Sequence, residues 1–169
     1  MSKRIRFYHV CCKPYDAYDV YYKAATLAYR CTSRRVHPTG KVMIAWKVSP
    51  TRASVNGSTY EKKRGRHSGC VVMRIPADLH GYRLSDTAYN LALIVGTLAH
   101  EFSHIQDEQS GRRRVRRPTS DPHGTPAERD ADYEEHRCLR MLVTHGKTRA
   151  MFTRLAKRLH KKGLKRHEH

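Results

Sequence analysis

The sequence has no hydrophobic run as long as a bilayer crossing needs, which is about 20 apolar residues. Hydrophobic residues make up 38% of its 169 residues, so the chain can bury a core of moderate size and we expect one soluble domain. The N-terminal sequence MSKRIRFYHVCCK lacks an apolar core followed by a small-residue cleavage site. We therefore expect no secretion signal.

Cysteine forms no regular pattern in the sequence. The five cysteines are odd in number and form no CxxC pair, which argues against a disulfide framework and against a structural zinc knuckle. They are Cys11, Cys12, Cys31, Cys70 and Cys138. We therefore expect a protein of the reducing cytoplasm, in which the cysteines act as small apolar residues.

Acidic residues are few beside the basic ones, since 15 Asp and Glu stand against 34 Lys and Arg and give a formal net charge of +19. An excess of this size indicates an acidic partner. The basic residues are concentrated in the C-terminal segment 147–165 and in an arginine-rich run that contains Arg112, Arg113, Arg114, Arg116 and Arg117. Such surfaces can bind nucleic acid with salt-sensitive affinity. An anionic membrane surface, a partner protein or a merely solvated face are the alternatives.

A long segment from Ser85 or Asp86 to Gly111 is predicted to form a buried helix. Its apolar residues recur at helical spacing, and Gly96 is its one internal helix breaker. Gly96 lies one turn before the sequence HEFSH, where a small residue leaves room beside a metal. The alternative is an ordinary core helix, but burying two histidines and a glutamate without a metal or hydrogen-bond partners is costly.

The sequence HEFSH within this helix is an HExxH motif. On a helix, His100 and His104 lie one turn apart on the same face, so both imidazoles can reach one metal ion. Glu101 then flanks the open coordination position. The motif therefore predicts half of a catalytic zinc site.

A catalytic zinc needs a third protein ligand, and the segment that begins at Thr125-Pro126 offers one. Threonine followed by proline is typical of a capped helix start. Glu128 and Asp132 lie one turn apart on this predicted helix, so Glu128 can bind the metal while Asp132 hydrogen-bonds the outer ring nitrogen of a ligand histidine. The alternative is a solvated charged face. We favour the ligand because the segment follows HEFSH by a short connection.

These residues resemble a family. HEFSH followed by Glu128, Ala131 and Asp132 resembles the gluzincin metallopeptidases, whose pattern is HExxH and then a helix carrying E-x-x-A/S-D. The short distance between the two blocks is most similar to compact members, including the ImmA/IrrE-type peptidases. The resemblance covers about residues 86–143. It implies zinc as the cofactor, His100, His104 and Glu128 as its ligands, Glu101 as the general base, and Asp132 as the support of a ligand histidine.

Two alternatives remain at this point. His123-Gly124 lies between the two blocks and is similar to the histidine ligand of SprT-like proteases, which work on proteins attached or close to DNA. In that alternative His123 replaces Glu128 as the third ligand. The other alternative is a non-catalytic nucleic-acid-binding protein on a zincin scaffold, in which zinc serves folding alone.

The chemistry expected of the site is hydrolysis of a peptide bond in a protein or peptide substrate. Glu101 would take a proton from the attacking water and pass it to the leaving amine. The reaction also needs a hydrogen-bond donor for the oxyanion. The candidate donors are Tyr133, His136, Tyr89 or a loop side chain.

The rest of the chain predicts an α+β fold. We expect a helix at 16–31, strands at 4–11, 41–48 and 70–79, and a polar loop at 49–69. This order is similar to a compact zincin-like domain, in which a small twisted, mainly antiparallel sheet packs on the HExxH helix and a following glutamate helix.

The resemblance also implies where a substrate would lie. CVVMRI, the last strand before the HExxH helix, is the expected edge strand that would receive an extended peptide. Residues 1–145 would form the metallopeptidase domain, and 146–169 a basic tail that is helical or flexible.

Overall fold

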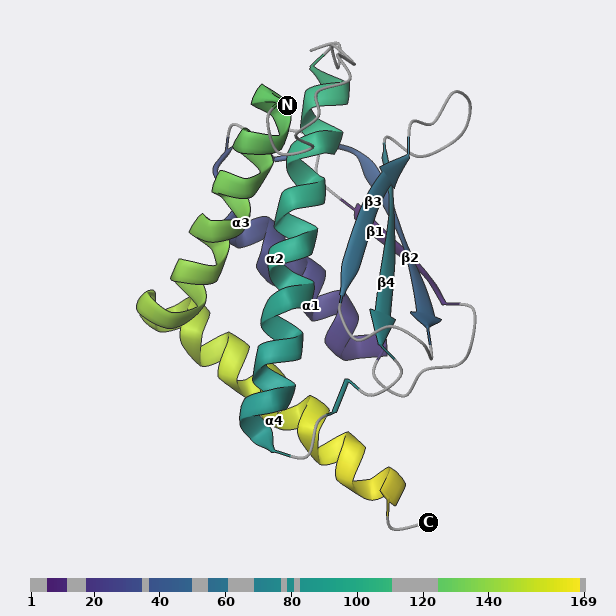
Figure 1. Ribbon diagram of the computed structural model, residues 1–169, viewed down its shortest axis with the longest axis vertical. Coiled ribbons are helices and arrows are strands. Elements are labelled where there is room, and N and C mark those ends of the chain that lie inside the picture. Colours follow the sequence, from purple (N-terminus) through teal and green to yellow (C-terminus); the bar gives the residue numbers. More distant parts are fainter. Residues whose placement is uncertain are drawn as a thin grey trace.

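In the described residues, the first half of the chain forms four strands with one helix between the first two, and the second half is helical (Figure 1). The computed structural model describes residues 6–11, 18–34, 37–49, 55–60, 69–76, 79–80, 83–110 and 125–167. The elements are β1 (Arg6–Cys11), α1 (Tyr18–Cys31), β2 (Lys41–Ser49), β3 (Asn56–Tyr60), β4 (Gly69–Pro76), α2 (Leu84–Gln109), α3 (Pro126–Thr144) and α4 (Gly146–His167). The α+β class is therefore confirmed.

The sheet is mixed and has the strand order β1-β2-β4-β3. β1 pairs with β2 in parallel and β2 pairs with β4 in parallel, while β3 pairs with β4 in the antiparallel direction. The prediction of a mainly antiparallel sheet is wrong, because α1 returns the chain to the starting end of the sheet and so makes β1 and β2 parallel. The predicted edge is also wrong, since CVVMRI belongs to β4, which lies between β2 and β3.

The edge strand β3 lies inside the segment that was predicted to be a loop. Its sequence, NGSTY, has no apolar alternation, so pattern alone does not indicate a strand. The strand is held by its pairing with β4, in which Gly57 lies opposite Met73 and Thr59 opposite Val71. Its face lies against α2, where a Cβ on Gly57 would be 2.7 Å from the Cγ2 of Thr97. Glycine therefore permits the close approach of β3 to α2.

The helices gather on one side of the sheet, with α2 between the sheet and α3 and with α4 across the lower end of α2 (Figure 1). The core between these layers is aromatic as well as aliphatic. The rings of Phe7 and Phe102 stack with centroids 5.4 Å apart, and those of Tyr21 and Trp46 stack at 4.7 Å. None of the helices within the described ranges combines the length and the hydropathy that a bilayer crossing requires.

The helix α3 packs closely along α2. Gly96 of α2 makes this possible, because a Cβ there would lie 3.2 Å from Leu139 and 3.3 Å from Glu135. The glycine thus leaves room for α3 rather than for the metal itself. The start of α3 is as predicted, since Thr125 caps it by accepting a hydrogen bond from the Glu128 backbone N–H at 3.2 Å.

The C-terminal helix α4 shares the core of the other helices. Leu155 and Leu159 are buried in it, and the backbone carbonyl of Leu159 lies 3.0 Å from the Nδ1 of His80. Three cysteines, Cys31, Cys70 and Cys138, are buried free thiols. Contact with Cys31, together with burial, raises the pKa of the Cys138 thiol. This agrees with the expectation that cysteines act here as small apolar residues.

Candidate metal centre

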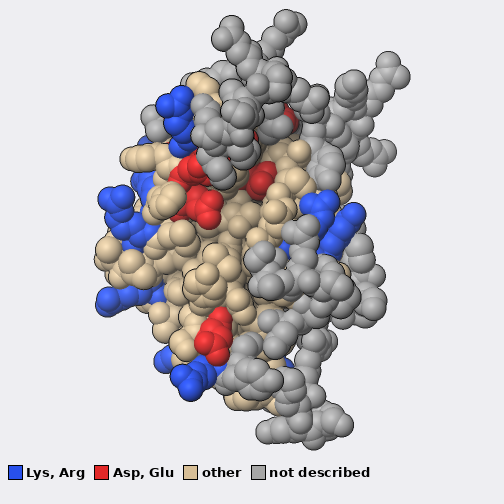
Figure 2. Space-filling view, in the orientation of Figure 1, with Lys and Arg blue, Asp and Glu red and all other residues tan. Residues whose placement is uncertain are grey.

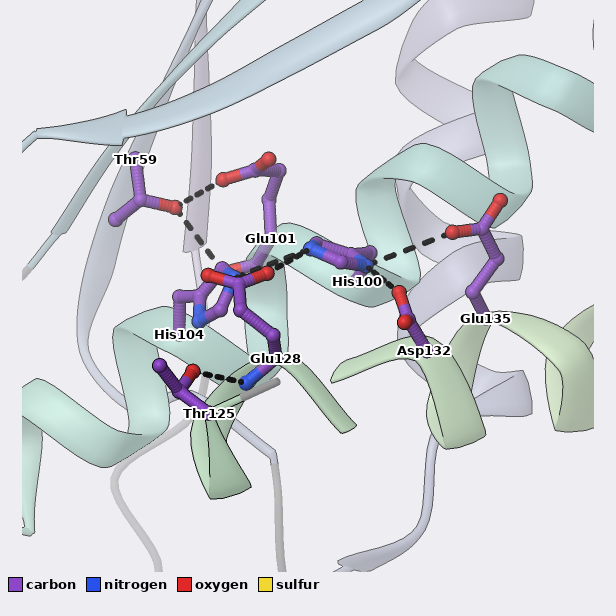
Figure 3. Close-up of polar contacts among 8 residues, drawn as sticks. All are labelled: Thr59, His100, Glu101, His104, Thr125, Glu128, Asp132 and Glu135. Carbon is purple, nitrogen blue, oxygen red and sulfur yellow. Dashed lines mark hydrogen bonds and ion pairs between the residues drawn. The ribbon is translucent and has the colours of Figure 1, made fainter. Parts of the chain in front are cut away.

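Two helices bring together three side chains that could bind a metal ion (Figure 3). The Nε2 atoms of His100 and His104 on α2 lie 3.1 Å apart. The Oε2 atom of Glu128 on α3 lies 3.3 Å from the first and 3.4 Å from the second. The three atoms thus form a nearly equilateral triangle that could hold a metal ion.

The helix geometry accounts for this convergence. His100 and His104 are one turn apart on α2 and share its face toward α3. Glu128 is in the first turn of α3, whose start is set by the Thr125 cap. Because Gly96 allows α3 to approach α2, the carboxylate of Glu128 reaches both imidazoles.

The outer nitrogen of His100 faces two carboxylates. Its Nδ1 lies 3.2 Å from Asp132 Oδ1 and 3.5 Å from Glu135 Oε2. A proton on Nδ1 can therefore be donated to a carboxylate, and this tautomer leaves the lone pair of Nε2 toward His104 and Glu128. The contact predicted for Asp132 is present, and Glu135 adds a second one.

The carboxylates around His100 favour a positive charge at this position. Burial by itself lowers the pKa of the His100 imidazole, but the surrounding carboxylates, that of Glu135 foremost, outweigh it and raise the pKa above its ordinary value. Acidic side chains gather over α2 and α3 on the face seen in Figure 2, although the protein as a whole carries a formal +19. A local excess of carboxylates in a basic protein suits a bound metal cation.

Glu101 points from α2 toward the edge strand rather than toward α3 (Figure 3). It is 6% exposed, and its carboxylate accepts a hydrogen bond from the hydroxyl of Thr59 on β3. Its other carboxylate oxygen would lie 3.0 Å from a Cβ on Gly57. The predicted general base is therefore held between the HExxH helix and the edge strand.

Three residues of this site were missed at the level of sequence. Glu135 lies seven residues after Glu128 on the same helix face, and that spacing could have indicated it. Thr59 and Gly57 had no comparable signal, because they belong to a strand that local pattern did not predict.

The remaining predicted residues are less closely tied to the centre. The Tyr133 side chain is 56% exposed, and His136 Nδ1 lies 2.7 Å from the Asp132 carbonyl of its own helix. Tyr89 is eleven residues before His100 on α2, about 16 Å along the helix axis, which is beyond the reach of its hydroxyl. Tyr133 and His136 stay predictions as oxyanion donors.

Two of the predicted features fall outside the described residues. These are the alternative ligand His123 and the arginine-rich run Arg112–Arg117. Comparison with protein-family models, curated proteins and solved structures found no match. The interpretation of the centre therefore depends on the geometry of its own side chains.

Proposed function

We propose that this protein is a zinc-dependent metallopeptidase with His100, His104 and Glu128 as the metal ligands. One observation carries the proposal: the three ligand atoms are separated by 3.1, 3.3 and 3.4 Å. Ligands bound at about 2.0–2.1 Å in a tetrahedral zinc site lie about 3.3–3.4 Å from one another. The spacing of these side chains therefore suits a tetrahedral ion of that size.

The charges of the three groups support a cation between them. With its proton on Nδ1, His100 presents the lone pair of Nε2 to a carboxylate oxygen of Glu128 at 3.3 Å. Two acceptors facing each other repel, and a metal ion removes that repulsion. A doubly protonated His100 would also remove this repulsion, because its Nε2 would donate a hydrogen bond to the Glu128 carboxylate. Measuring the metal content of the purified protein distinguishes a bound ion from a protonated His100.

The ligand types favour zinc and hydrolysis. Two imidazoles and one carboxylate would hold zinc with a coordination position left open, and the bound ion would supply Lewis acidity toward a carbonyl and toward water. Asp132 and Glu135 would hold the His100 ring in the orientation and tautomer that ligation requires.

Glu101 would act as the general base. Glu101 directly follows His100 in sequence, yet its carboxylate does not join the ligand triangle, since it turns toward β3 and binds Thr59. One oxygen is thereby oriented by the Thr59 hydroxyl, and the other can accept the proton of the attacking water. The same carboxylic acid would then deliver that proton to the leaving amine.

The edge strand β3 would receive the substrate. The resemblance to zincins implies an edge strand beside the active-site helix, and β3 takes the place that the sequence assigned to CVVMRI in β4. Within the described part of the chain, one edge of β3 pairs with β4 and its other edge pairs with no strand. An extended peptide added there would run past Glu101.

The test of this function is the Glu101→Gln variant, assayed with a quenched-fluorescence peptide library alongside its zinc content. We expect turnover to fall at least about 100-fold while zinc stays bound, because the amide cannot act as a base. Asp130→Asn is the matched control, since Asp130 is an exposed carboxylate on α3 outside the ligand triangle. Full turnover by Glu101→Gln would overturn the proposed role of Glu101.

A further inference from the structure

A basic groove of about 990 Å³ lies between α1 and α4, and none of its lining residues belongs to the metal centre. Five of the lining residues are basic, and none of the described ones is acidic. They are Lys23 and Arg30 from α1 and Lys147, Arg154 and Arg158 from α4. The groove is thus a concave surface of one charge.

The basic residues of each wall recur at helical spacing. Lys23 and Arg30 are seven residues apart on α1, and Lys147, Arg154 and Arg158 follow one another at intervals of seven and four on α4. These intervals keep the side chains of a wall on one helix face, and they correspond to about 10 Å and 6 Å along the helix axis. Each wall therefore presents cations in a row along the groove.

The lining of the groove also includes apolar side chains and an aromatic ring. Tyr22 of α1 is 46% exposed, and Met151 and the largely buried Leu155 of α4 also line the groove. Rows of cations flanking an exposed aromatic residue match the way proteins hold unpaired nucleotides, with phosphates on Lys and Arg and bases on apolar surface. We infer that this groove binds single-stranded nucleic acid.

An anionic membrane fits the groove less well. A membrane-surface helix inserts an apolar face between lipids, but the apolar side of α4, with Leu155, Ala156 and Leu159, is buried in the protein core. The residues that α4 leaves exposed are mainly basic, with Leu164 the one large apolar side chain among those described. The charge is thus available to phosphates in solution, while the apolar surface needed for insertion is not.

Two of the basic side chains that line the groove already contact other side chains of the protein. Arg158 forms an ion pair with Asp19 at 2.6 Å, and the Nη1 of Arg30 lies 4.0 Å from the Sδ of Met151. Lys23 and Arg154 are exposed and come from opposite walls. This pair therefore tests the groove with the least effect on packing.

The test measures binding of a short fluorescein-labelled single-stranded DNA of mixed sequence to the full chain by fluorescence anisotropy over a range of salt concentrations. For Lys23→Ala/Arg154→Ala we expect the steepness of the plot of log affinity against log salt concentration to fall by about 1.4. If the variant and the unaltered protein bind equally at 1 M salt, the variant then binds about 25-fold more weakly at 0.1 M salt. Tyr22→Ala should weaken binding at least about fivefold through lost base stacking.

The matched control is Lys47→Ala/Arg140→Ala, which removes the same charge from exposed positions on β2 and α3. Its affinity should stay within about threefold of that of the unaltered protein, because it leaves the groove intact. Lys23→Gln/Arg154→Gln, which removes both charges but keeps a longer, polar side chain than alanine, replaces the alanine pair if thermal unfolding shows that pair to be misfolded.

Three outcomes would overturn the inference. An equal loss of DNA affinity in Lys47→Ala/Arg140→Ala would mean that only the total charge of the protein matters. Undiminished binding by the groove variants would place the contact elsewhere, such as in Arg112–Arg117, which all variants retain. Binding to phosphatidylserine vesicles but not to the DNA would assign the groove to a lipid surface. Because every metal ligand is unchanged in these variants, none of these results bears on the zinc proposal.

Discussion

The hydroxyl of Thr59 on the edge strand donates a hydrogen bond to the carboxylate of Glu101 on the HExxH helix. The main-chain carbonyl of Glu101 lies 3.3 Å from the same hydroxyl oxygen. Glu101 is therefore positioned by a strand that pairs with β4 and by the helix that carries the histidines. In the proposed enzyme, the substrate edge and the general base form one structural unit.

Replacing Thr59 by valine tests this link. Valine keeps the shape of threonine but cannot donate a hydrogen bond, so the Glu101 carboxylate loses its orientation. We expect kcat/KM to fall about tenfold, in line with about 1.5 kcal/mol for a hydrogen bond to a charged group, with zinc content unchanged. Thr59→Ser, which retains the hydroxyl, should stay near full activity. Equal activity of the valine and serine variants would contradict the positioning role.

The two carboxylates at His100 Nδ1 should set metal affinity. Asp132 lies 3.2 Å and Glu135 3.5 Å from this nitrogen, so either can accept its proton. We expect Asp132→Asn/Glu135→Gln to weaken zinc binding about 10- to 100-fold, measured by competition with a zinc indicator, while the metal ligands themselves are intact. Asp130→Asn provides the control on the same helix. Unchanged zinc affinity in the double variant would show that these carboxylates do not support the ligand.

Zinc affinity should also fall as the pH falls. A protonated imidazole cannot ligate, and the carboxylates near His100 raise its pKa, so competition by protons begins at a higher pH than an ordinary histidine would give. The measurement is the zinc dissociation constant across a pH series. In Glu135→Gln the pKa of His100 should drop, and the loss of affinity should move to lower pH. A loss that does not move would contradict the role of Glu135.

The packing of α4 against His80 can be tested by substituting Gly163. A Cβ on Gly163 would overlap the side chain of His80, whose Nδ1 contacts the Leu159 carbonyl of the same helix. Although alanine is the better helix former, we expect Gly163→Ala to lower the free energy of unfolding by about 1–3 kcal/mol in urea titrations. Gly146→Ala, where a Cβ meets no atom within 4 Å, should not destabilise the protein. Equal stability of the two variants would contradict this packing.

Local sequence patterns predict the helices that carry the proposed metal ligands, because capping and apolar spacing involve only a few consecutive residues. Thr125 caps α3 as expected, and α2 spans Leu84–Gln109, close to the predicted bounds. The triangle of His100, His104 and Glu128 lies where the spacing and the family resemblance place it. What the sequence did not indicate is the role of Gly96, which depends on the helix that packs against it.

The sheet was predicted less well, because strand order depends on pairing between distant segments. The parallel pairing of β1 and β2 follows from the helix between them, a signal that the antiparallel prediction left out. β3 has a polar sequence and becomes a strand through its partners β4 and α2. Thr59 could not be identified from sequence, because its role depends on both the register of β3 and the position of Glu101.

The central claim is that Glu128 completes a zinc site with the two histidines. Metal content by mass spectrometry, measured on the purified protein and on His100→Ala, Glu128→Ala, His123→Ala and Asp130→Ala, tests it most directly. We expect one zinc per chain in the unaltered protein, in His123→Ala and in Asp130→Ala, and the loss of zinc in the other two variants. Zinc retained by Glu128→Ala and lost by His123→Ala, or no zinc in the unaltered protein after purification without chelators, would contradict it.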